Sequence, residues 1–466
     1  MNFKRLPLVF LVVISLACNA TNLKLGSPPT GTPTVTFTFT PTPTPTLTPT
    51  PLAPSYIPSA CANTALATVP AATALAVPTP VLQANPPITK ELQKRVFEQV
   101  YAIILENYVD PDFNGVDLPA LADDVRKKIE SGLDTETFYA EIQAFVTALG
   151  DEHSDFESPV EVSLADAALA GGADYVGIGV YVNSMLEKGH LTVLAVFPGS
   201  PAEHAGLKVH DSLLMADGLL LVEGGKTYIQ RIRGPQCSAV VLTVQSPGQA
   251  PRELMLVREK ISGGVPIEAR LVPTSDGSRV GYIFLPTFFD VTIPDQVRDA
   301  LESFGPLDGL ILDNRMNGGG SSNVVEPILS FFTSGTLGHY VSRAGSRPLT
   351  VTADEIHNSQ SVPIIVLVGE DTVSYGEVFA GVLQDFGRAL IVGQTTLGNV
   401  EILHGYIFDD DSRIWIAQET FVPEFSQADW EATGIIPSLE AFADWDTFTF
   451  ETDPAIVAAL QLLGFK

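Results

Sequence analysis

The chain has 466 residues, 45% of them hydrophobic, and a formal net charge of −28. A chain of this length buries a sizeable core and has room for about three domains. The negative charge argues against nucleic acid or an anionic membrane surface as the main partner, because both would repel an acidic protein.

The N-terminus has the pattern of an export signal. Lys4 and Arg5 precede an apolar run over residues 6–17, which is too short for a stable membrane span but typical of a signal peptide. The run ends in the letters SLAC. A small residue before a cysteine resembles a bacterial lipobox, which implies that Cys18 becomes lipidated and anchors the mature chain. Ordinary secretory cleavage is the alternative, and both place the protein outside the cytoplasm, with residues 1–18 as the signal.

Residues 19–87 are mostly Thr, Pro and Ala, with TPTPTPTLTPTP at their centre. Such a composition cannot bury enough apolar surface to offset the entropy of ordering the chain. We expect a disordered, extended linker here. The two further cysteines, Cys61 and Cys237, lie in this linker and in a later domain. We expect no disulfide framework from so distant a pair, and no Cys/His cluster that predicts a metal site.

Residues 88–160 predict a small helical subdomain. Apolar side chains recur at helical spacing through residues 92–104. Two further helical patterns, at residues 118–131 and 135–149, are each followed or closed by a glycine, as helices commonly are.

Residues 172–262 change to the short alternating runs of β-strands. The segment FPGSPAEHAGL and the apolar run that follows it resemble a PDZ domain. The resemblance implies a loop whose N–H groups bind the terminal carboxylate of a peptide, which then adds a strand to the sheet. The residues of that loop are Tyr175, Val176, Gly177, Ile178 and Gly179. The alternative is an ordinary hairpin of a β-domain.

Residues 263–466 alternate strand and helix patterns, with strands expected at 280–285, 309–313, 364–368 and 389–392. The order β-α-β predicts a layered α/β domain with a largely parallel core sheet. Function in such domains lies in the loops beyond the carboxyl ends of the strands.

One of these loops, GEDTVSYGE, ends at Ser374 and opens a helix. A serine at a helix N-terminus is suited to nucleophilic attack, because the free N–H groups there stabilise an oxyanion. Ser374 and Glu377 also fit a capping box, which needs no catalysis. The local sequence leaves both interpretations open.

Three motifs together resemble the S41 carboxyl-terminal-processing serine peptidases. They are ILDNRMNGGGSSN, the Ser374 loop and LQDFGRALIVGQTTLGN, and the likeness runs from about residue 88 to 445. The resemblance implies that Ser374 is the nucleophile and that no cofactor is needed. It also implies an oxyanion hole made by backbone N–H groups of Tyr375 and of the glycine run Gly318, Gly319 and Gly320.

The chain departs from the tail-specific branch of that family at its general base. Those enzymes have a lysine 25 positions after the serine, and this chain has Asn399 there. An asparagine side chain cannot accept a proton at neutral pH, which excludes a Ser/Lys dyad. Other S41 branches use Ser, His and Glu. By resemblance to their motifs, His153 in LGDEHSDFESP is the predicted base and Glu431 in DWEATGIIPS its orienting acid; His404 is the competing base.

The sequence therefore predicts an extracytoplasmic serine endopeptidase that acts on polypeptides and recognises their C-terminal tails through a PDZ domain. Its only expected membrane contact is a lipid anchor at Cys18. The alternative is a catalytically inactive PDZ scaffold that binds protein tails at the cell surface. The missing lysine is the reason for considering it.

Overall fold

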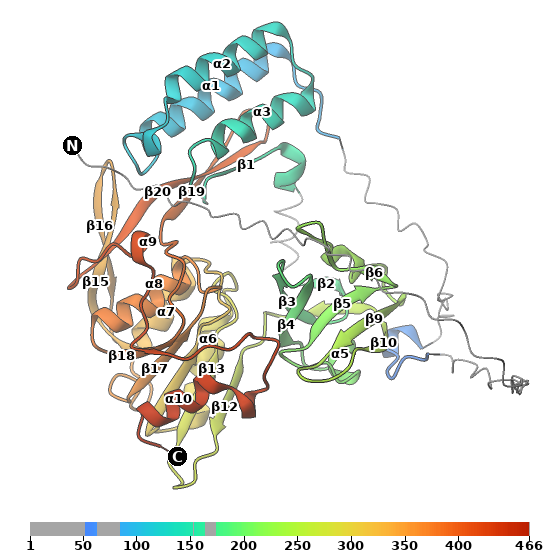
Figure 1. Ribbon diagram of the computed structural model, residues 1–466, viewed down its shortest axis with the longest axis vertical. Helices are drawn as coiled ribbons and strands as arrows, with labels where there is room; N and C mark the ends of the chain where they lie inside the picture. Colours follow the sequence, from blue (N-terminus) through green and yellow to red (C-terminus); the bar gives the residue numbers. More distant parts are fainter. Residues whose placement is uncertain (1–51, 63–83, 152, 164–173, 466) are drawn as a thin grey trace, which may run out of the picture. The chain divides into compact units, whose positions relative to one another are not determined.

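The computed structural model describes residues 52–62, 84–151, 153–163 and 174–465 (Figure 1). The expected signal peptide, the lipidation site Cys18 and most of the Thr/Pro-rich segment lie outside the described residues. Within those ranges, no helix has the length and apolar character needed to cross a membrane.

Three helices form a bundle at the start of the second range: α1 Lys90–Asn107, α2 Leu118–Ser131 and α3 Thr135–Thr147, with a short 3-10 turn, η2, at Phe113–Gly115. Each helix begins after a side chain that accepts a backbone N–H from its first turn, which stabilises a helix N-terminus. The three capping residues are Thr89, Asp117 and Asp134. The three helices lie side by side (Figure 1). The apolar faces of these helices share one buried cluster.

A β-rich module follows. Its main sheet has the strand order β10-β9-β5-β4-β3, with β6 beside β5, and two-stranded pairs are formed by β11 with β2 and by β7 with β8. The strands are β2 Asp174–Gly177, β3 Val180–Met185, β4 His190–Val196, β5 Ser212–Ala216, β6 Leu219–Leu220, β7 Val222–Glu223, β8 Lys226–Thr227, β9 Ala239–Gln245, β10 Arg252–Val257 and β11 Glu259–Ser262, with helical turns α5 Pro201–His204 and η3 Ile229–Arg231.

The segment expected to bind a carboxylate is divided between a strand and a turn. Tyr175, Val176 and Gly177 belong to β2, and Ile178 and Gly179 connect it to β3. Gly179 has φ 82°, and a Cβ added there would lie 2.2 Å from the Cβ of Ser200. The turn therefore requires glycine at this position.

The expected α/β domain is built on a six-stranded sheet of order β12-β13-β14-β17-β18-β21. Five of these strands run parallel, and β12 pairs antiparallel with β13. The strands are β12 Glu268–Val272, β13 Val280–Phe284, β14 Gly309–Asp313, β17 Ile364–Val368, β18 Ala389–Gly393 and β21 Leu439–Glu440. The helices are α6 Ile293–Phe304, α7 Ser322–Phe332, α8 Tyr375–Asp385, α9 Trp430–Thr433 and α10 Pro454–Leu462, with the 3-10 turn η4 Phe450–Thr452.

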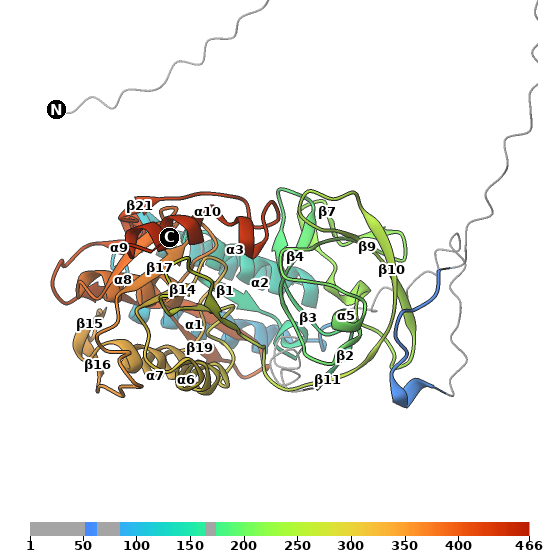
Figure 2. The same ribbon diagram turned by 90° about the horizontal axis from the view of Figure 1, so that it is seen from below.

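Helices cover both faces of this sheet, as its continuous apolar strands require. Ile283, Leu312 and Val366 point to the face that packs on α6, α7 and α8. Their strand neighbours, such as Tyr282 and Ile311, point to the opposite face, which packs on α10. Figure 2 shows α10 on one side of the sheet and α6 and α7 on the other. The alternation follows from the two-residue period of a strand.

A second sheet joins distant parts of the chain. Its order is β1-β20-β15-β16, with β19 also paired to β20. The short strand β1, Asp155–Glu157, pairs with the start of β20, Arg413–Pro423, so that Phe156 lies opposite Ile414. The other strands are β15 Gly335–Ser342, β16 Gly345–Val351 and β19 Ile402–Ile407. The residues before β1 are thereby held against the C-terminal third of the chain.

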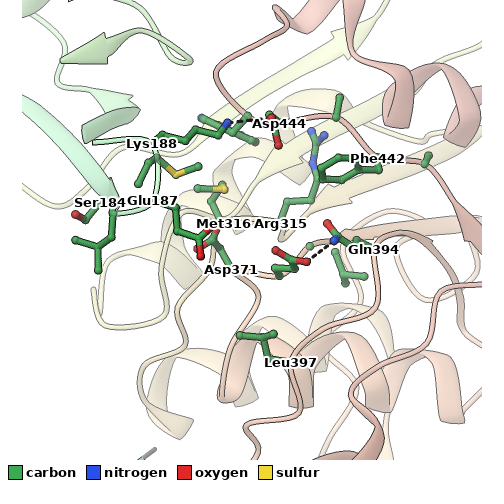
Figure 3. A pocket seen from close by; sticks show the side chains of 18 residues that line it. Ser184, Glu187, Lys188, Arg315, Met316, Asp371, Gln394, Leu397, Phe442 and Asp444 are labelled. Atoms are coloured by element: carbon green, nitrogen blue, oxygen red, sulfur yellow. Dashed lines mark hydrogen bonds and ion pairs between the residues drawn. The ribbon is translucent and has the colours of Figure 1, made fainter. Parts of the chain in front are cut away.

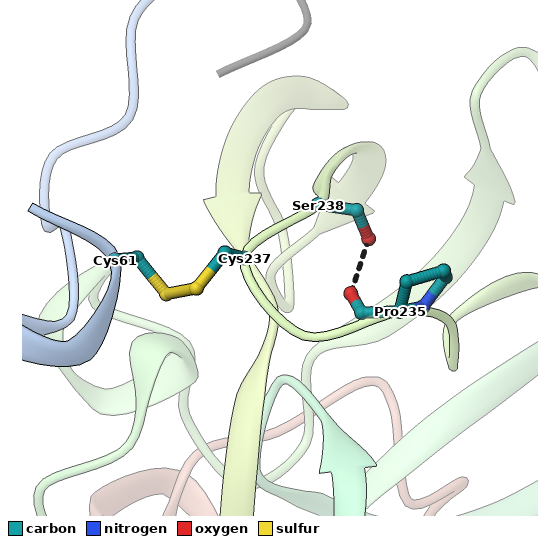
Figure 4. The surroundings of a disulfide bond; sticks show 4 residues. All are labelled: Cys61, Pro235, Cys237 and Ser238. Carbon is teal, nitrogen blue, oxygen red and sulfur yellow. Dashed lines mark hydrogen bonds between the residues drawn. A yellow bond between two sulfur atoms is a disulfide. The ribbon is translucent and has the colours of Figure 1, made fainter. Parts of the chain in front are cut away.

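The cysteine prediction is wrong. Cys61 and Cys237 form a disulfide with an S–S distance of 2.06 Å (Figure 4). Cys61 ends a 3-10 turn, η1 Ser59–Cys61, and Tyr56 stacks on the ring of His204 with centroids 3.9 Å apart. The two cysteines are brought together by packing of the segment 52–62 against the β-rich module. Their spacing along the chain gave no sign of this contact.

Replacing Cys61 by Ser should lower the free energy of unfolding by about 2–4 kcal/mol, because a cross-link restricts the unfolded chain. Denaturant unfolding with and without dithiothreitol measures the effect. The reductant should destabilise the wild type and leave the variant unchanged. Alkylation of both Cys61 and Cys237 in the unreduced, denatured wild type would contradict the prediction.

Candidate active site

Ser374 lies in the turn between β17 and α8. Its backbone has φ 55° and ψ −125°, a conformation that a non-glycine residue adopts only when its surroundings impose it. Such a turn presents the side chain beyond the end of the parallel sheet and at the N-terminus of α8. Strain at a half-buried serine in this position is typical of a functional residue rather than of a helix cap alone.

Glu377 imposes the conformation of that turn. Its buried carboxylate accepts N–H groups from Ser374 at 3.3 Å, from Gly398 at 2.9 Å and from Asn399 at 2.8 Å. The Ser374 N–H also donates to the carbonyl oxygen of Asn399 at 2.8 Å. The capping interpretation of Ser374 and Glu377 is therefore correct for the backbone, and the same contacts fix Ser374 to the segment 398–399.

The glycine loop after β14 presses against Ser374. A Cβ added to Gly319 would lie 2.8 Å from the Cβ and 3.2 Å from the Oγ of Ser374. The Gly319 N–H donates to Asn317 Oδ1 at 3.0 Å, which makes it the least available of the predicted oxyanion donors. Within the described ranges, the N–H groups of Gly318, Gly320 and Tyr375 have no recorded protein acceptor. These three are the better oxyanion candidates.

Buried side chains hold the glycine loop and the serine turn together. Asn314 Nδ2 donates to the carbonyl oxygen of Gly376 at 2.7 Å, and Thr372 Oγ1 donates to that of Asn314 at 2.8 Å. The N–H of Val373 donates to the carbonyl oxygen of Asn317 at 3.0 Å. Asn314 and Asn317 are both fully buried. Sequence reasoning assigned these motif residues no role, although their position beside the glycine run was a signal.

The structure brings the side chains of His153 and Glu431 together. The Nε2 atom of His153 lies 3.4 Å from Glu431 Oε1. The other oxygen of Glu431 accepts the Val400 N–H at 2.8 Å. The backbone of His153 is fixed by Asp151, whose Oδ1 accepts its N–H at 2.9 Å, and Ser154 Oγ accepts the Ala417 N–H from β20.

A third side chain, Glu401, completes this cluster and was not expected. Its Oε2 lies 3.9 Å from the same Nε2 atom of His153. Burial and the charge of Glu431 raise the pKa of Glu401 to about 7, although His153 lowers it. Burial lowers the pKa of His153, but the two glutamates and Asp151 outweigh that effect and raise it overall.

The structure contains no hydrogen bond between the Ser374 hydroxyl and the His153 ring, both of which lie in the described ranges. The two are linked through consecutive residues of one segment. Asn399 accepts the Ser374 N–H, Val400 donates to Glu431, and Glu401 faces His153.

His404, the competing base, belongs to a different surface. It lies on β19, half-exposed, with its Nε2 atom 3.1 Å from Glu419 Oε2. Arg347 donates two further hydrogen bonds to Glu419, at 2.7 and 3.0 Å. Burial raises the pKa of Glu419, but the contacts from Arg347 and His404 lower it overall. No contact between His404 and Ser374 is recorded in the described part of the chain.

A pocket of about 390 Å³ lies at the carboxyl ends of β14, β17 and β18 (Figure 3). Its wall includes Asp371, from the Ser374 turn, and Leu397, from the segment that fixes Ser374. The β3–β4 turn closes the other side, where Lys188 pairs with Asp444 at 3.2 Å. Leu397 is 64% exposed, so an apolar wall is available to a ligand beside the serine turn.

Only one group of described side chains could share a metal ion. His153, Glu401 and Glu431 offer one atom each within 4.8 Å of one another. The same arrangement serves a histidine base, because nearby carboxylates stabilise its imidazolium form. The cluster is joined to the segment whose backbone binds Ser374, and we assign no metal to it.

A parallel α/β sheet, a strained serine at a helix N-terminus and a glycine loop beside it are the features of a serine-type hydrolase. The model of the family described as "Peptidase family S41" matches residues 279–441. The chain is 29% identical to the carboxyl-terminal-processing protease of Synechocystis sp., over 80% of this chain and 87% of that protein. It is 30% identical to the chloroplastic C-terminal processing peptidase of Tetradesmus obliquus, over 66% and 68%.

A solved structure, the photosystem II D1 C-terminal processing protease, has a TM-score of 0.55 with this fold at 24% identity, covering 80% of this chain and 97% of that one. The chain belongs to peptidase family S41, among the carboxyl-terminal-processing peptidases. It is a serine-type hydrolase of peptide bonds, and its substrates are polypeptides. The family resemblance seen in the sequence is confirmed.

Glu377→Gln should lower the free energy of unfolding by about 1–3 kcal/mol, because an amide cannot accept all three buried N–H groups. Labelling of Ser374 by a fluorophosphonate should also slow, since the serine turn loses its support. Denaturant unfolding and labelling rates measure both effects. Glu370→Gln, at an exposed carboxylate in the same loop, is the control. Equal stability of the two variants would contradict the prediction.

Proposed function

We propose that the protein is an extracytoplasmic endopeptidase in which Ser374 is the nucleophile, His153 the general base and Glu431 its orienting acid. The observation that carries the proposal is the continuous connection from the strained Ser374 turn, through residues 399–401, to the His153 and Glu431 side chains. Serine catalysis needs a nucleophile, a base and an orienting acid held close together. This connection fixes the backbone of all three parts of the site relative to one another.

The chemistry follows from which nitrogen of His153 is free. Because Nε2 faces the glutamates, Nδ1 is the atom that accepts the Ser374 proton as Oγ attacks the substrate carbonyl carbon. The oxyanion accepts N–H groups from Tyr375 and the 318–320 loop. The imidazolium then gives its proton to the leaving amine, and water releases the acyl group by the same steps.

The base must approach the nucleophile for this transfer, since the two are not hydrogen-bonded. Catalytic hydrogen bonds often tighten only when substrate is bound. Ser154 is attached to β20 and Asp151 accepts the His153 N–H, so a small shift of β20 would move His153 with it.

The β-rich module acts in this proposal as a PDZ domain for substrate tails. A pocket of about 220 Å³ lies beside β3, the edge strand of the sheet, and is lined by apolar side chains including Tyr175 and Ile232. An edge strand next to an apolar pocket suits a peptide that adds a strand and inserts its last side chain. Arg233 lies over the Tyr175 ring at 5.3 Å, where its charge would attract a terminal carboxylate.

Lipidation of Cys18 would tether the enzyme to the outer face of the membrane. The disulfide supports an extracytoplasmic site, because such bonds persist in oxidising compartments.

A fluorophosphonate probe tests the nucleophile and the base. Ser374→Ala should abolish labelling, and His153→Gln should slow it by about 10²–10⁴-fold, the usual contribution of a general base. His404→Gln should label at the wild-type rate, because that ring is committed to Glu419. Circular dichroism establishes that each variant is folded.

Labelling that survives Ser374→Ala would reject the nucleophile. An unlabelled wild type that still binds peptide tails would favour the inactive scaffold. Asn399, in place of the lysine base, is the reason for considering that alternative. Slow labelling of His404→Gln alone would transfer the base to His404.

Arg233→Glu should weaken binding of a peptide with a free C-terminal valine carboxylate by about tenfold or more, since it replaces attraction by repulsion. Fluorescence anisotropy in the Ser374→Ala protein measures it without cleavage. Arg231→Glu, two residues earlier in the same turn, is the control. An amidated peptide that binds as tightly as the free acid would contradict carboxylate recognition.

A further inference from the structure

The ring nitrogen Nε2 of His153 faces two carboxylates rather than one. Glu431 Oε1 lies at 3.4 Å and Glu401 Oε2 at 3.9 Å. One N–H can make a good hydrogen bond to only one of these oxygens. Glu431 is fixed by Val400, whereas Glu401 Oε2 is buried and has no hydrogen-bond partner. A buried carboxylate oxygen without a partner requires an explanation.

We propose that Glu401 is a second positioning carboxylate for His153, which competes with Glu431 for the ring N–H and sets the pH at which His153 releases its proton. The inference rests on the proposed role of His153 as base. Within the described residues, Glu401 has a recorded contact with His153 and none with Ser374, so it would act through the histidine.

The surroundings of Glu401 give it this influence. Its side chain is 13% exposed and that of His153 8%, so water screens their interaction weakly. The charged groups that act on Glu401 are acids apart from the histidine: Glu431 from α9, Asp151 after α3 and Asp110 after α1. Tyr108, at the end of α1, faces Asp151 and Glu401 with a phenol whose pKa burial raises.

Two adjacent groups of this kind titrate as a coupled pair. When Glu401 is ionised, its charge stabilises the imidazolium and raises the pH needed for His153 to become a free base. When Glu401 carries a proton, Glu431 alone holds the ring. The acid limb of catalysis should therefore reflect both groups rather than His153 alone.

Glu401→Gln in the full chain tests the proposal through the pH dependence of the fluorophosphonate labelling rate. Removing a charge this close should move the acid limb to lower pH by about one unit, the size of shift that an opposite charge within 4–6 Å produces. Nuclear magnetic resonance titration of histidine-labelled protein in the Ser374→Ala background should show the same downward shift for the His153 ring, assigned by its absence in His153→Gln.

Glu424→Gln is the matched control. Glu424 also has an oxygen without a partner beside a histidine ring, at 3.6 Å from His339, but on the other end of β20. It should leave the acid limb and the His153 titration unchanged. A shift in this variant equal to that of Glu401→Gln would overturn the proposal, because it would show a general charge effect.

A stability measurement separates a role of charge from a role of shape. Burial raises the pKa of folded Glu401 from 4.5 to about 7, so the unfolded chain loses this proton first as the pH rises. The ionised group then destabilises the fold above neutral pH and has no effect below pH 4.5. Glu401→Gln should raise the melting temperature at pH 8 and leave it unchanged below pH 4.5.

The failures are distinguishable. Normal labelling of His153→Gln would reject the base itself and with it the proposed function. Slow labelling of His153→Gln, together with superimposable acid limbs and His153 titrations for Glu401→Gln and wild type, would reject only the role of Glu401.

Discussion

The buried carboxylate of Glu377 is the interaction on which the candidate site depends. It accepts three backbone N–H groups, from Ser374, Gly398 and Asn399. Burial raises the pKa of Glu377, and these hydrogen bonds oppose that rise, which is how a charge can be kept in the interior. Val400 donates to Glu431, and Glu401 faces His153. The Glu377 carboxylate, which holds Ser374 in its strained conformation, therefore also fixes the segment that would orient the base.

Some residues of the sequence motifs stabilise the fold. In ILDNR, Asp313 at the end of β14 pairs with Arg315, which also binds Asp453 at the N-terminus of α10. All three are buried, and Tyr282 Oη donates to Asp313 at 2.8 Å. Breaking such a network would leave an uncompensated buried charge, so these residues hold α10 on the sheet.

Local patterns predicted the helices and the parallel sheet. The spacing of apolar residues and the glycines that flank an element both determine secondary structure over only a few residues. Counting from Ser374 places Asn399 where the resembling enzymes have lysine, and in the structure the carbonyl oxygen of Asn399 accepts the Ser374 N–H. The disulfide and Glu401 were missed for a common reason. Each depends on contacts between segments far apart in the chain. In the neighbouring sequence, nothing distinguishes these cysteines or Glu401 from side chains exposed to solvent.

The position of His153 also depends on a contact between segments far apart in the chain. The ring is carried by residues that pair with β20 across a sequence separation of 263 residues. Position 399 is not a lysine. If His153 is the base, as proposed, serine activation depends on that long-range pairing. A lysine supplied by the neighbouring segment would be present whenever the α/β domain folds. In the proposed mechanism, a histidine supplied through β1 and β20 would be present only when the helical subdomain is also docked, so that folding of the whole chain would be a condition for activity.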